Sequence, residues 1–215
     1  YTTLFRSNSP AIVNDYIKQH PDFALRMINE PEKGSGAAAD TGARYAIKNG
    51  AEVIARTDAD SLPIPKWVSL LRKDFSDGKR IVGGRLKPRT DEPECRWYDN
   101  AAATVLLRVG EHAPRFLYRR PGQKYPMFMV AGLNMAIDAK LYQEVGGFPR
   151  TKIEESDDDI ALHLKVCQII SRQQAKLNKQ AIVYSSTRRA RAMGYIRTLL
   201  WYWDRKYIPD EADVR

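Results

Sequence analysis

The chain has 215 residues, a length typical of one globular domain. It is 43% hydrophobic and 28% charged, and its longest uncharged runs, residues 125–137 and 101–107, are shorter than the ~20 residues of a membrane span. These values exclude a disordered chain and a spanning helix. With 35 Lys and Arg against 26 Asp and Glu, the net charge of +9 favours anionic partners: nucleic acid, a phosphorylated small molecule or an acidic membrane surface. Cys95 and Cys167 form neither a disulfide framework nor a zinc motif, which predicts a reducing, cytosolic setting.

The first seven residues stand apart from the rest of the chain. Tyr1–Ser7 can be back-translated into the end of a common sequencing adapter, and neither an initiating Met nor a signal peptide precedes Ser9. We therefore expect residues 1–7 to be a non-native leader and the natural gene to extend further upstream.

The first half of the chain alternates between predicted helices and strands. Ser9-Pro10 is a typical helix start, and Gly50 is a typical residue just after a helix end. Alternation at this spacing is typical of βαβ units and predicts a largely parallel sheet with helices on both faces. In chain order, the predicted elements are a helix from Ser9 to Pro21, a strand at 23–28, a helix at 37–49, a strand at 52–56, a helix carrying Trp67, Leu70, Leu71 and Phe75, and a strand at 80–86.

The second half has a less regular pattern. Residues 188–206 combine basic with aromatic side chains. This tail is expected to pack against the domain or a missing segment, and the alternative is an interface or a bilayer surface. Before the tail, the predicted elements are a helix at 98–108, a polar loop at 115–124, a strand at 127–137, a helix at 139–145 capped by Asp138, a helix opened by residues 156–159, and a strand at 181–184.

Asp58 and Asp60 directly follow the predicted strand at 52–56. In open α/β sheets, ligands bind beyond the carboxyl ends of the strands. Two carboxylates one residue apart on such a turn can both reach a hard divalent cation, which prefers oxygen ligands. The structural alternative is a turn in which Asp60 caps the residues that follow.

Five carboxylates lie between residues 154 and 159. Acids in the first turn of a helix are each favoured by its dipole by ~0.3–1 kcal/mol, and Ser156 with Asp159 resembles a capping box. Three successive aspartates nevertheless repel one another unless a cation or a base function uses them. The cluster therefore indicates either helix capping or a functional site.

The histidines and the Gly34-Ser35-Gly36 segment give weaker signals. The glycine segment lacks the spacing of a phosphate-binding loop. None of the three histidines is assigned a ligand role, and His163 is expected at the surface or half buried.

Four segments, taken in this order, resemble the family-2 glycosyltransferases of the GT-A fold. They are GAAADTGARYA, VIARTDADSLPIPKWV, VAGLNMAIDAKLYQEVGGF and SDDDIALHLKV, and the resemblance covers residues 34–189. It implies an α/β, Rossmann-like single domain with a mainly parallel twisted sheet flanked by helices. This catalytic domain would span residues 8–190, with the family's first strand and its base-recognising acid missing upstream of Ser9, and a basic aromatic tail would follow at 191–215.

The resemblance implies a donor site and an acceptor site. Asp58 and Asp60 would hold Mg²⁺ or Mn²⁺ at the diphosphate of a nucleotide-sugar donor. The other residues implied to line these sites are Gly132 and Asn134 on the acceptor side and Arg188 and Arg189 at the diphosphate.

The resemblance also implies that Asp157 is the general base of a transfer with inversion, taking the proton from the acceptor hydroxyl. Ser156 stands where the family has a further acid, so Asp158 or Glu155 is the alternative base. Ala39-Asp40 replaces the Arg-Asn that the family often carries, and no QxxRW segment of the processive synthases is present.

These roles imply a nucleotide-diphosphate sugar donor and a carbohydrate or lipid-linked acceptor, in bacterial cell-surface glycan or glycolipid synthesis. The implied location is cytoplasmic, at the inner face of the plasma membrane, with peripheral contact to anionic lipid and no nucleic-acid partner. One alternative is a phosphatase of the haloacid dehalogenase type with Asp58 as nucleophile, although Leu62 stands where that class has Thr or Val. The other is a basic nucleic-acid-binding module, favoured by the charge of +9 but without a recognisable binding motif.

Overall fold

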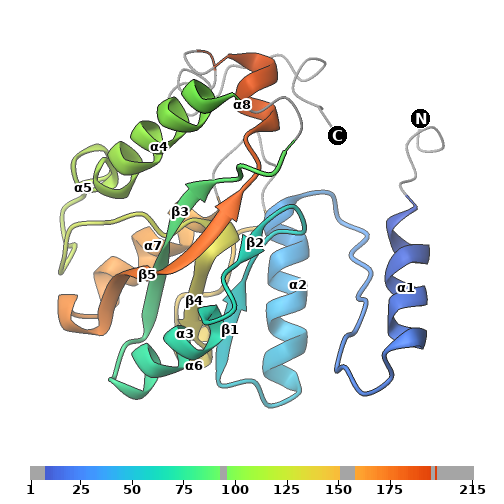
Figure 1. Ribbon diagram of the computed structural model, residues 1–215. Helices are drawn as coiled ribbons and strands as arrows, with labels where there is room; N and C mark the ends of the chain where they lie inside the picture. Colours follow the sequence, from blue (N-terminus) through green and yellow to red (C-terminus); the bar gives the residue numbers. More distant parts are fainter. Residues whose placement is uncertain (1–7, 93–95, 151–157, 195–196, 198–215) are drawn as a thin grey trace.

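The computed structural model describes residues 8–92, 96–150, 158–194 and 197. These residues form an α/β domain around a five-stranded sheet of order β1-β4-β3-β5-β2 (Figure 1). The strands are β1 (Val53–Arg56), β2 (Leu62–Pro63), β3 (Ile81–Pro88), β4 (Met135–Asp138) and β5 (Ala175–Ser185). The helices are α1 (Ser9–Gln19), α2 (Ser35–Lys48), α3 (Trp67–Ser76), α4 (Trp97–His112), α5 (Pro114–Leu117), η1 (Gly132–Asn134), α6 (Ala139–Glu144), α7 (Asp158–Ile169), η2 (Arg172–Gln174) and α8 (Arg188–Met193).

The sheet is mixed, which corrects the prediction of a mainly parallel one. Strands β1, β3 and β5 share one direction, but among the described strands only β3 and β5 are parallel neighbours. Strand β4 is antiparallel to both β1 and β3, because the chain leaves β3 at its carboxyl end, forms α4 and α5, and re-enters the sheet through η1 from that same edge. Strand β2 is antiparallel to its neighbour β5 and lies at the opposite edge of the sheet from β1.

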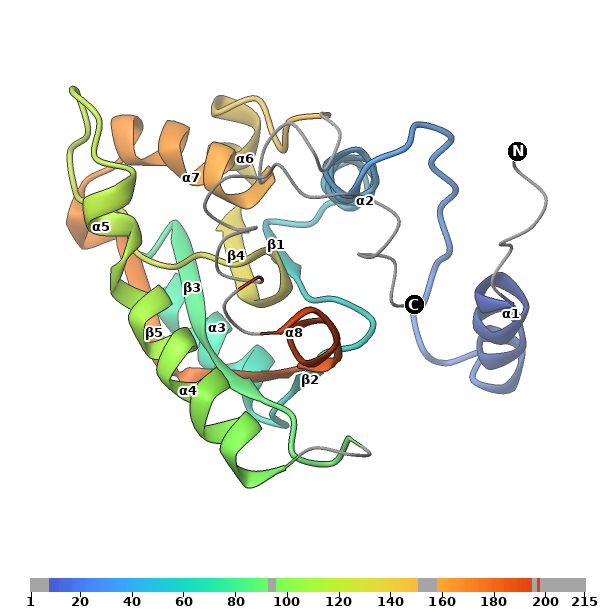
Figure 2. The same cartoon turned by 90° about the horizontal axis from the view of Figure 1, so that it is seen from above.

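Helices cover both faces of the sheet, as the sequence predicts. Successive strand residues point to opposite faces, so Ile81 and Ile137 belong to one apolar core while Val82 and Ala136 belong to the other. The first core is covered by α2, α6 and α7, and the second contains Trp67 of α3. Figure 2 shows α2, α6 and α7 on one side of the sheet and α3, α4 and α8 on the other.

Several predicted elements are confirmed, including α1, α2, α3 and α6, where the Asp138 carboxylate caps α6 by accepting from Leu141 N at 2.8 Å. Other predictions were wrong. Residues 23–28 form no strand, because no described strand pairs with them and Phe23 and Met27 remain exposed. The strand expected at 127–137 begins only at Met135, and the loop expected at 115–124 begins within α5.

His163 is 1% exposed, in contrast to the predicted surface or half-buried position. Its Nε2 lies 3.1 Å from Tyr125 Oη, and its ring packs against Phe128 with the centroids 4.8 Å apart. Burial lowers the pKa of His163 to about 3, because the charged form cannot be solvated there. His163 is therefore a neutral core residue.

No helix among the described residues has both the length and the apolar character needed to cross a bilayer.

Candidate active site

Asp58 and Asp60 lie on the turn that leaves the carboxyl end of β1. Ser61 N donates to Asp58 O at 3.1 Å, and Arg89 Nη1 donates to Asp60 O at 3.3 Å, so backbone carbonyls fix the turn while both aspartates stay exposed. Partial desolvation raises the pKa of the Asp58 carboxyl; Arg56 opposes this shift, and Asp60 and Asp158 add to it. The two aspartates and the start of α7 therefore share one electrostatic environment.

Arg56 connects this turn to the acidic cluster. Its Nη1 donates to Asp158 Oδ2 at 2.8 Å, and the two side chains are only 19% and 13% exposed. The guanidinium also lies 5.0 Å from the centre of the Phe148 ring and against Gly132, where an added Cβ would stand 2.9 Å from Arg56 Cζ. Asp158 therefore faces the end of β1 and not bulk solvent.

Asp159 connects the start of α7 to η1. One carboxylate oxygen accepts from Gly132 N and the other from Ile160 N, both at 2.7 Å. Burial raises the pKa of Asp159, and the hydrogen bond from Gly132 N opposes this shift. Asp159 and Asp158 thus bond amides at the start of their own helix, as the capping alternative predicts. Their other carboxylate oxygens bind Gly132 N and Arg56 at the carboxyl end of β1.

The other predicted site residues have distinct surroundings. Gly132 lies beside Arg56 at this edge, whereas the Asn134 side chain is fully buried. The Asn134 amide accepts from Trp67 Nε1 at 2.9 Å and donates to Arg85 O and Ala181 O at 3.0 Å each. This geometry favours a positioning role for Asn134, without direct acceptor contact. Asp157 lies outside the described residues.

Arg188 begins α8, which Figure 2 shows above the sheet between α2 and α4. Its Nε lies 3.8 Å from Glu92 Oε1, and Arg191 Nη2 lies 2.9 Å from Glu92 Oε2. Burial alone would raise the pKa of Glu92. The hydrogen bonds from Ser186 and Thr187, together with the charges of Arg191 and Arg89, outweigh this effect, so the pKa is lowered and Glu92 stays charged. The side chain of Arg189 is not described.

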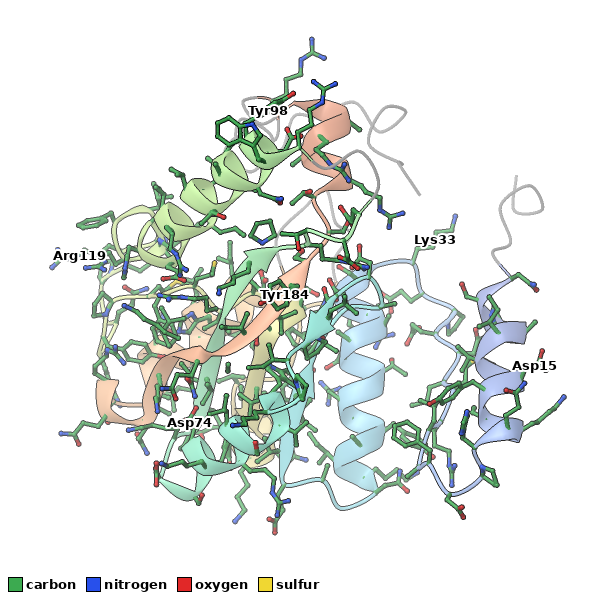
Figure 3. All side chains as sticks on the ribbon, viewed as in Figure 1. Asp15, Lys33, Asp74, Tyr98, Arg119 and Tyr184 are labelled. Carbon is green, nitrogen blue, oxygen red and sulfur yellow. The ribbon has the colours of Figure 1, made fainter. Side chains whose placement is uncertain are left out.

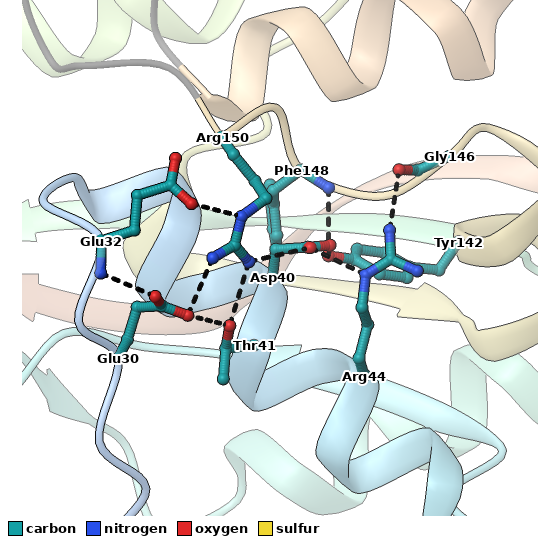
Figure 4. A network of polar contacts seen from close by, with 9 residues as sticks. All are labelled: Glu30, Glu32, Asp40, Thr41, Arg44, Tyr142, Gly146, Phe148 and Arg150. Atoms are coloured by element: carbon teal, nitrogen blue, oxygen red, sulfur yellow. Dashed lines mark hydrogen bonds and ion pairs between the residues drawn. The ribbon is translucent and has the colours of Figure 1, made fainter.

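A network that the sequence did not predict fixes the turn at 146–150 (Figure 4). Buried Asp40 accepts from Tyr142 Oη at 2.8 Å and from Arg44 Nε at 2.7 Å, and Tyr142 Oη in turn accepts from Phe148 N at 3.0 Å. Arg150 binds Glu30 at 2.9 Å and Glu32 at 2.8 Å. Asp40, at the position where the family often has Asn, thus holds α2, α6 and the turn together. Its contact with Tyr142 joins residues 102 positions apart, and no local sequence spacing signals such a contact.

Gly36, in the segment Gly34-Ser35-Gly36, lets α2 approach this turn closely. A Cβ on Gly36 would stand 2.2 Å from Pro149 O and 3.2 Å from Asp158 Cβ, whereas a Cβ on Gly42 of the same helix would meet nothing within 4 Å. Gly36 therefore serves packing against α7 and the turn.

We expect Gly36→Ala to lower the free energy of unfolding by ~1–3 kcal/mol, because backbone must move to admit the methyl group. Gly42→Ala is the matched control and should raise that free energy by ~0.5–1 kcal/mol, since alanine favours the helix and has room. Urea unfolding measures both. Equal shifts of the same sign in the two variants would contradict the close approach of Gly36 to Pro149.

The family model described as Glycosyl transferase family 2 matches residues 6–146 of the 215. The chain belongs to glycosyltransferase family 2. The match includes the turn that carries Asp58 and Asp60, here called the DxD turn, and the helices α2 and α3 on either side of it. The phosphatase alternative was built on that turn and is therefore set aside.

The fold of this family-2 chain is also found among solved structures. A mannosyltransferase from Pyrobaculum calidifontis, solved in complex with GDP-Man and Mn²⁺, superposes with a TM-score of 0.60 at 20% sequence identity. The match covers 97% of this chain and 55% of the mannosyltransferase, so this chain spans about half the length of that protein. A likeness at this identity shows a shared GT-A-like fold. No curated protein sequence matches the chain.

The donor atoms of the DxD turn are of the kind that a divalent cation needs. Among the described residues of the chain, no three His, Cys, Asp or Glu side chains come together as a metal-ligand cluster. Mg²⁺ and Mn²⁺ bind oxygen ligands, and Mg²⁺ at a phosphate-bearing ligand commonly uses one or two carboxylates plus phosphate oxygens and water. Asp58 and Asp60 supply the two carboxylates that such an ion commonly uses.

Proposed function

We propose that this family-2 transferase moves a sugar from a nucleotide-diphosphate donor to an acceptor hydroxyl with inversion at the anomeric carbon. The observation that carries the proposal is the ion pair of Arg56 with Asp158 at 2.8 Å, which brings the start of α7 to the end of β1, two residues before Asp58. A donor-binding turn and a segment that carries a general base must lie close together, because the attacking hydroxyl has to reach the sugar bound to the diphosphate.

On the donor side, Asp58 and Asp60 would hold Mg²⁺ or Mn²⁺. The ion, when bound, supplies positive charge that stabilises the departing diphosphate. Arg188, at the start of α8 above the sheet, and the adjacent Arg189 would add charge-assisted hydrogen bonds to the same phosphates.

On the acceptor side, we assign the general base to Asp157. The carboxylates of its neighbours already have partners, since Asp158 binds Arg56 and Asp159 binds Gly132 N. The Asp158 carboxylate is held against the end of β1 by Arg56, and this contact argues against Asp158 as the group that reaches the acceptor hydroxyl. Gly132, which has room for no side chain beside Arg56, would border the acceptor, and Asn134 would hold η1 in place from the core.

The Pyrobaculum protein was solved with GDP-Man and Mn²⁺, which makes GDP-mannose the first donor to test here. We propose a carbohydrate or lipid-linked acceptor, in bacterial cell-surface glycan or glycolipid synthesis at the inner face of the plasma membrane. We further propose that residues 8–190 form the catalytic domain and that residues 191–215 form a basic aromatic tail.

Titration calorimetry with a panel of nucleotide-diphosphate sugars tests the proposal. We expect one donor to bind at least about tenfold more tightly with Mn²⁺ or Mg²⁺ than with a chelator, a gain of about 1.4 kcal/mol. The matching nucleoside monophosphate is the control and should show little metal dependence, because it lacks the diphosphate. Equal donor affinity in the chelator, or retained anomeric configuration in a transfer product, would contradict the proposal.

A further inference from the structure

The outer face of α4 and α5 is apolar where a surface helix is ordinarily polar. Trp97, Val105, Val109 and Phe116 are 81%, 61%, 62% and 76% exposed, and their spacing places them on one side of the two helices. An open groove at the end of this face is lined partly by Val109, Phe116 and Leu117. We define the α4–α5 face as Trp97, Val105, Val109, Phe116 and Leu117.

The inner side of α4 carries a charged group instead. Glu111 is 2% exposed and binds Arg85 of β3 through two hydrogen bonds, at 2.7 and 3.0 Å, and Arg108 at 2.8 Å. Rotating α4 to bury its apolar side would expose or unpair this carboxylate and its two arginines. Removing one partner of a buried ion pair leaves an uncompensated buried charge, so this contact holds the apolar side outward.

Positive charge surrounds the α4–α5 face. Between residues 96 and 124 the sequence has six Lys and Arg and two acids, Asp99 and Glu111. The Asp99 carboxylate accepts from Arg96 N at 3.1 Å at the start of α4, and Glu111 is buried. Figure 3 shows Tyr98 at the start of the face and Arg119 just beyond its end. The exposed basic residues near the face are Arg96, Arg115, Arg119, Arg120 and Lys124.

We propose that the α4–α5 face docks on the surface of an anionic lipid bilayer. An apolar helix side with an aromatic residue near each end and arginines beside it matches an interfacial helix, whose apolar side chains enter the bilayer while cations contact lipid phosphates. An apolar protein partner would not require the surrounding positive charge. The α4–α5 face would thus be the part of the protein that makes the proposed membrane contact. It belongs to the segment that follows β3 at the carboxyl edge of the sheet.

Co-sedimentation of the full chain with vesicles tests the proposal without donor or metal, so a failure of the transferase proposal leaves the result unaffected. One vesicle is phosphatidylcholine alone, and the other contains about 30% phosphatidylglycerol, enough to give a negative surface potential. We expect at least about tenfold tighter binding to the anionic vesicles, weakened by salt because the charges are at the surface.

The decisive variant is Val109→Glu with Phe116→Glu, and it should lose at least about tenfold in vesicle affinity because charge cannot enter the apolar part of the bilayer. The matched control is Val68→Glu with Phe23→Glu, two side chains that are 58% and 59% exposed and lie outside α4 and α5, and it should bind as the parent does. A second variant, Arg119→Gln with Arg120→Gln, changes exposed positions and should reduce the preference for anionic vesicles.

Parent-like vesicle binding by the Val109/Phe116 variant would overturn the proposal. So would equal binding of the parent to neutral vesicles. If the Val109/Phe116 variant instead changed the sedimentation coefficient from a dimer to a monomer and kept its vesicle affinity, the face would be an interface between copies of this chain and the proposal would be wrong.

Discussion

Asp157→Asn is expected to reduce turnover by about 10²–10⁴-fold, the usual contribution of a positioned general base. The amide preserves the shape of the side chain and removes its ability to take the hydroxyl proton. Donor affinity should therefore stay within about twofold, a change of less than about 0.5 kcal/mol. Steady-state transfer and donor titration on the same preparation measure the two quantities.

Asp158→Asn separates catalysis from structure at the adjacent position. Arg56 would lose its carboxylate partner in a largely buried site, so this variant should lose about 3 kcal/mol of unfolding free energy while keeping most of its turnover under native conditions. If Asp157→Asn kept its turnover while Asp158→Asn lost turnover and still bound the donor fully, the general base would be Asp158. Retained turnover in both would reject Asp157 and Asp158 as the base.

Local patterns predicted much of the fold. The apolar spacing of Trp67 and Leu71 marks α3, and the Asp138 cap marks α6, because such signals depend on neighbours within one or two helical turns. The direction of β4 depends on where the chain re-enters the sheet after α4 and α5, which no local pattern records. Residues 23–28 have a strand-like composition, but a strand forms only where another strand pairs with it.

The candidate site was predictable in part for the same reason. The order of the motifs indicated that the DxD turn and the acidic cluster belong to one site, and the Arg56–Asp158 contact joins the two segments. The roles of Arg56 and Asp40 were missed, because each acts through partners 102 positions away. Asn134 was predicted to line the acceptor side, yet its side chain is buried, since sequence spacing does not record which way a residue in η1 points.

Asp60→Ala is expected to weaken metal-dependent donor binding by at least about 100-fold, or about 2.7 kcal/mol. The reason is that two carboxylates are the protein ligands proposed for the ion, and the diphosphate binds through that ion. Asp58→Ala should have a similar effect. Donor affinity measured in the presence of a chelator should change little in either variant, because the parent protein also lacks the ion under that condition.

Asp77→Ala changes an exposed acid at the end of α3. It is the matched control and should bind donor as the parent does. Calorimetric titration with and without Mn²⁺ measures the difference, and an unchanged metal dependence in Asp60→Ala would show that the turn at Asp58 and Asp60 is a structural cap, not a metal site.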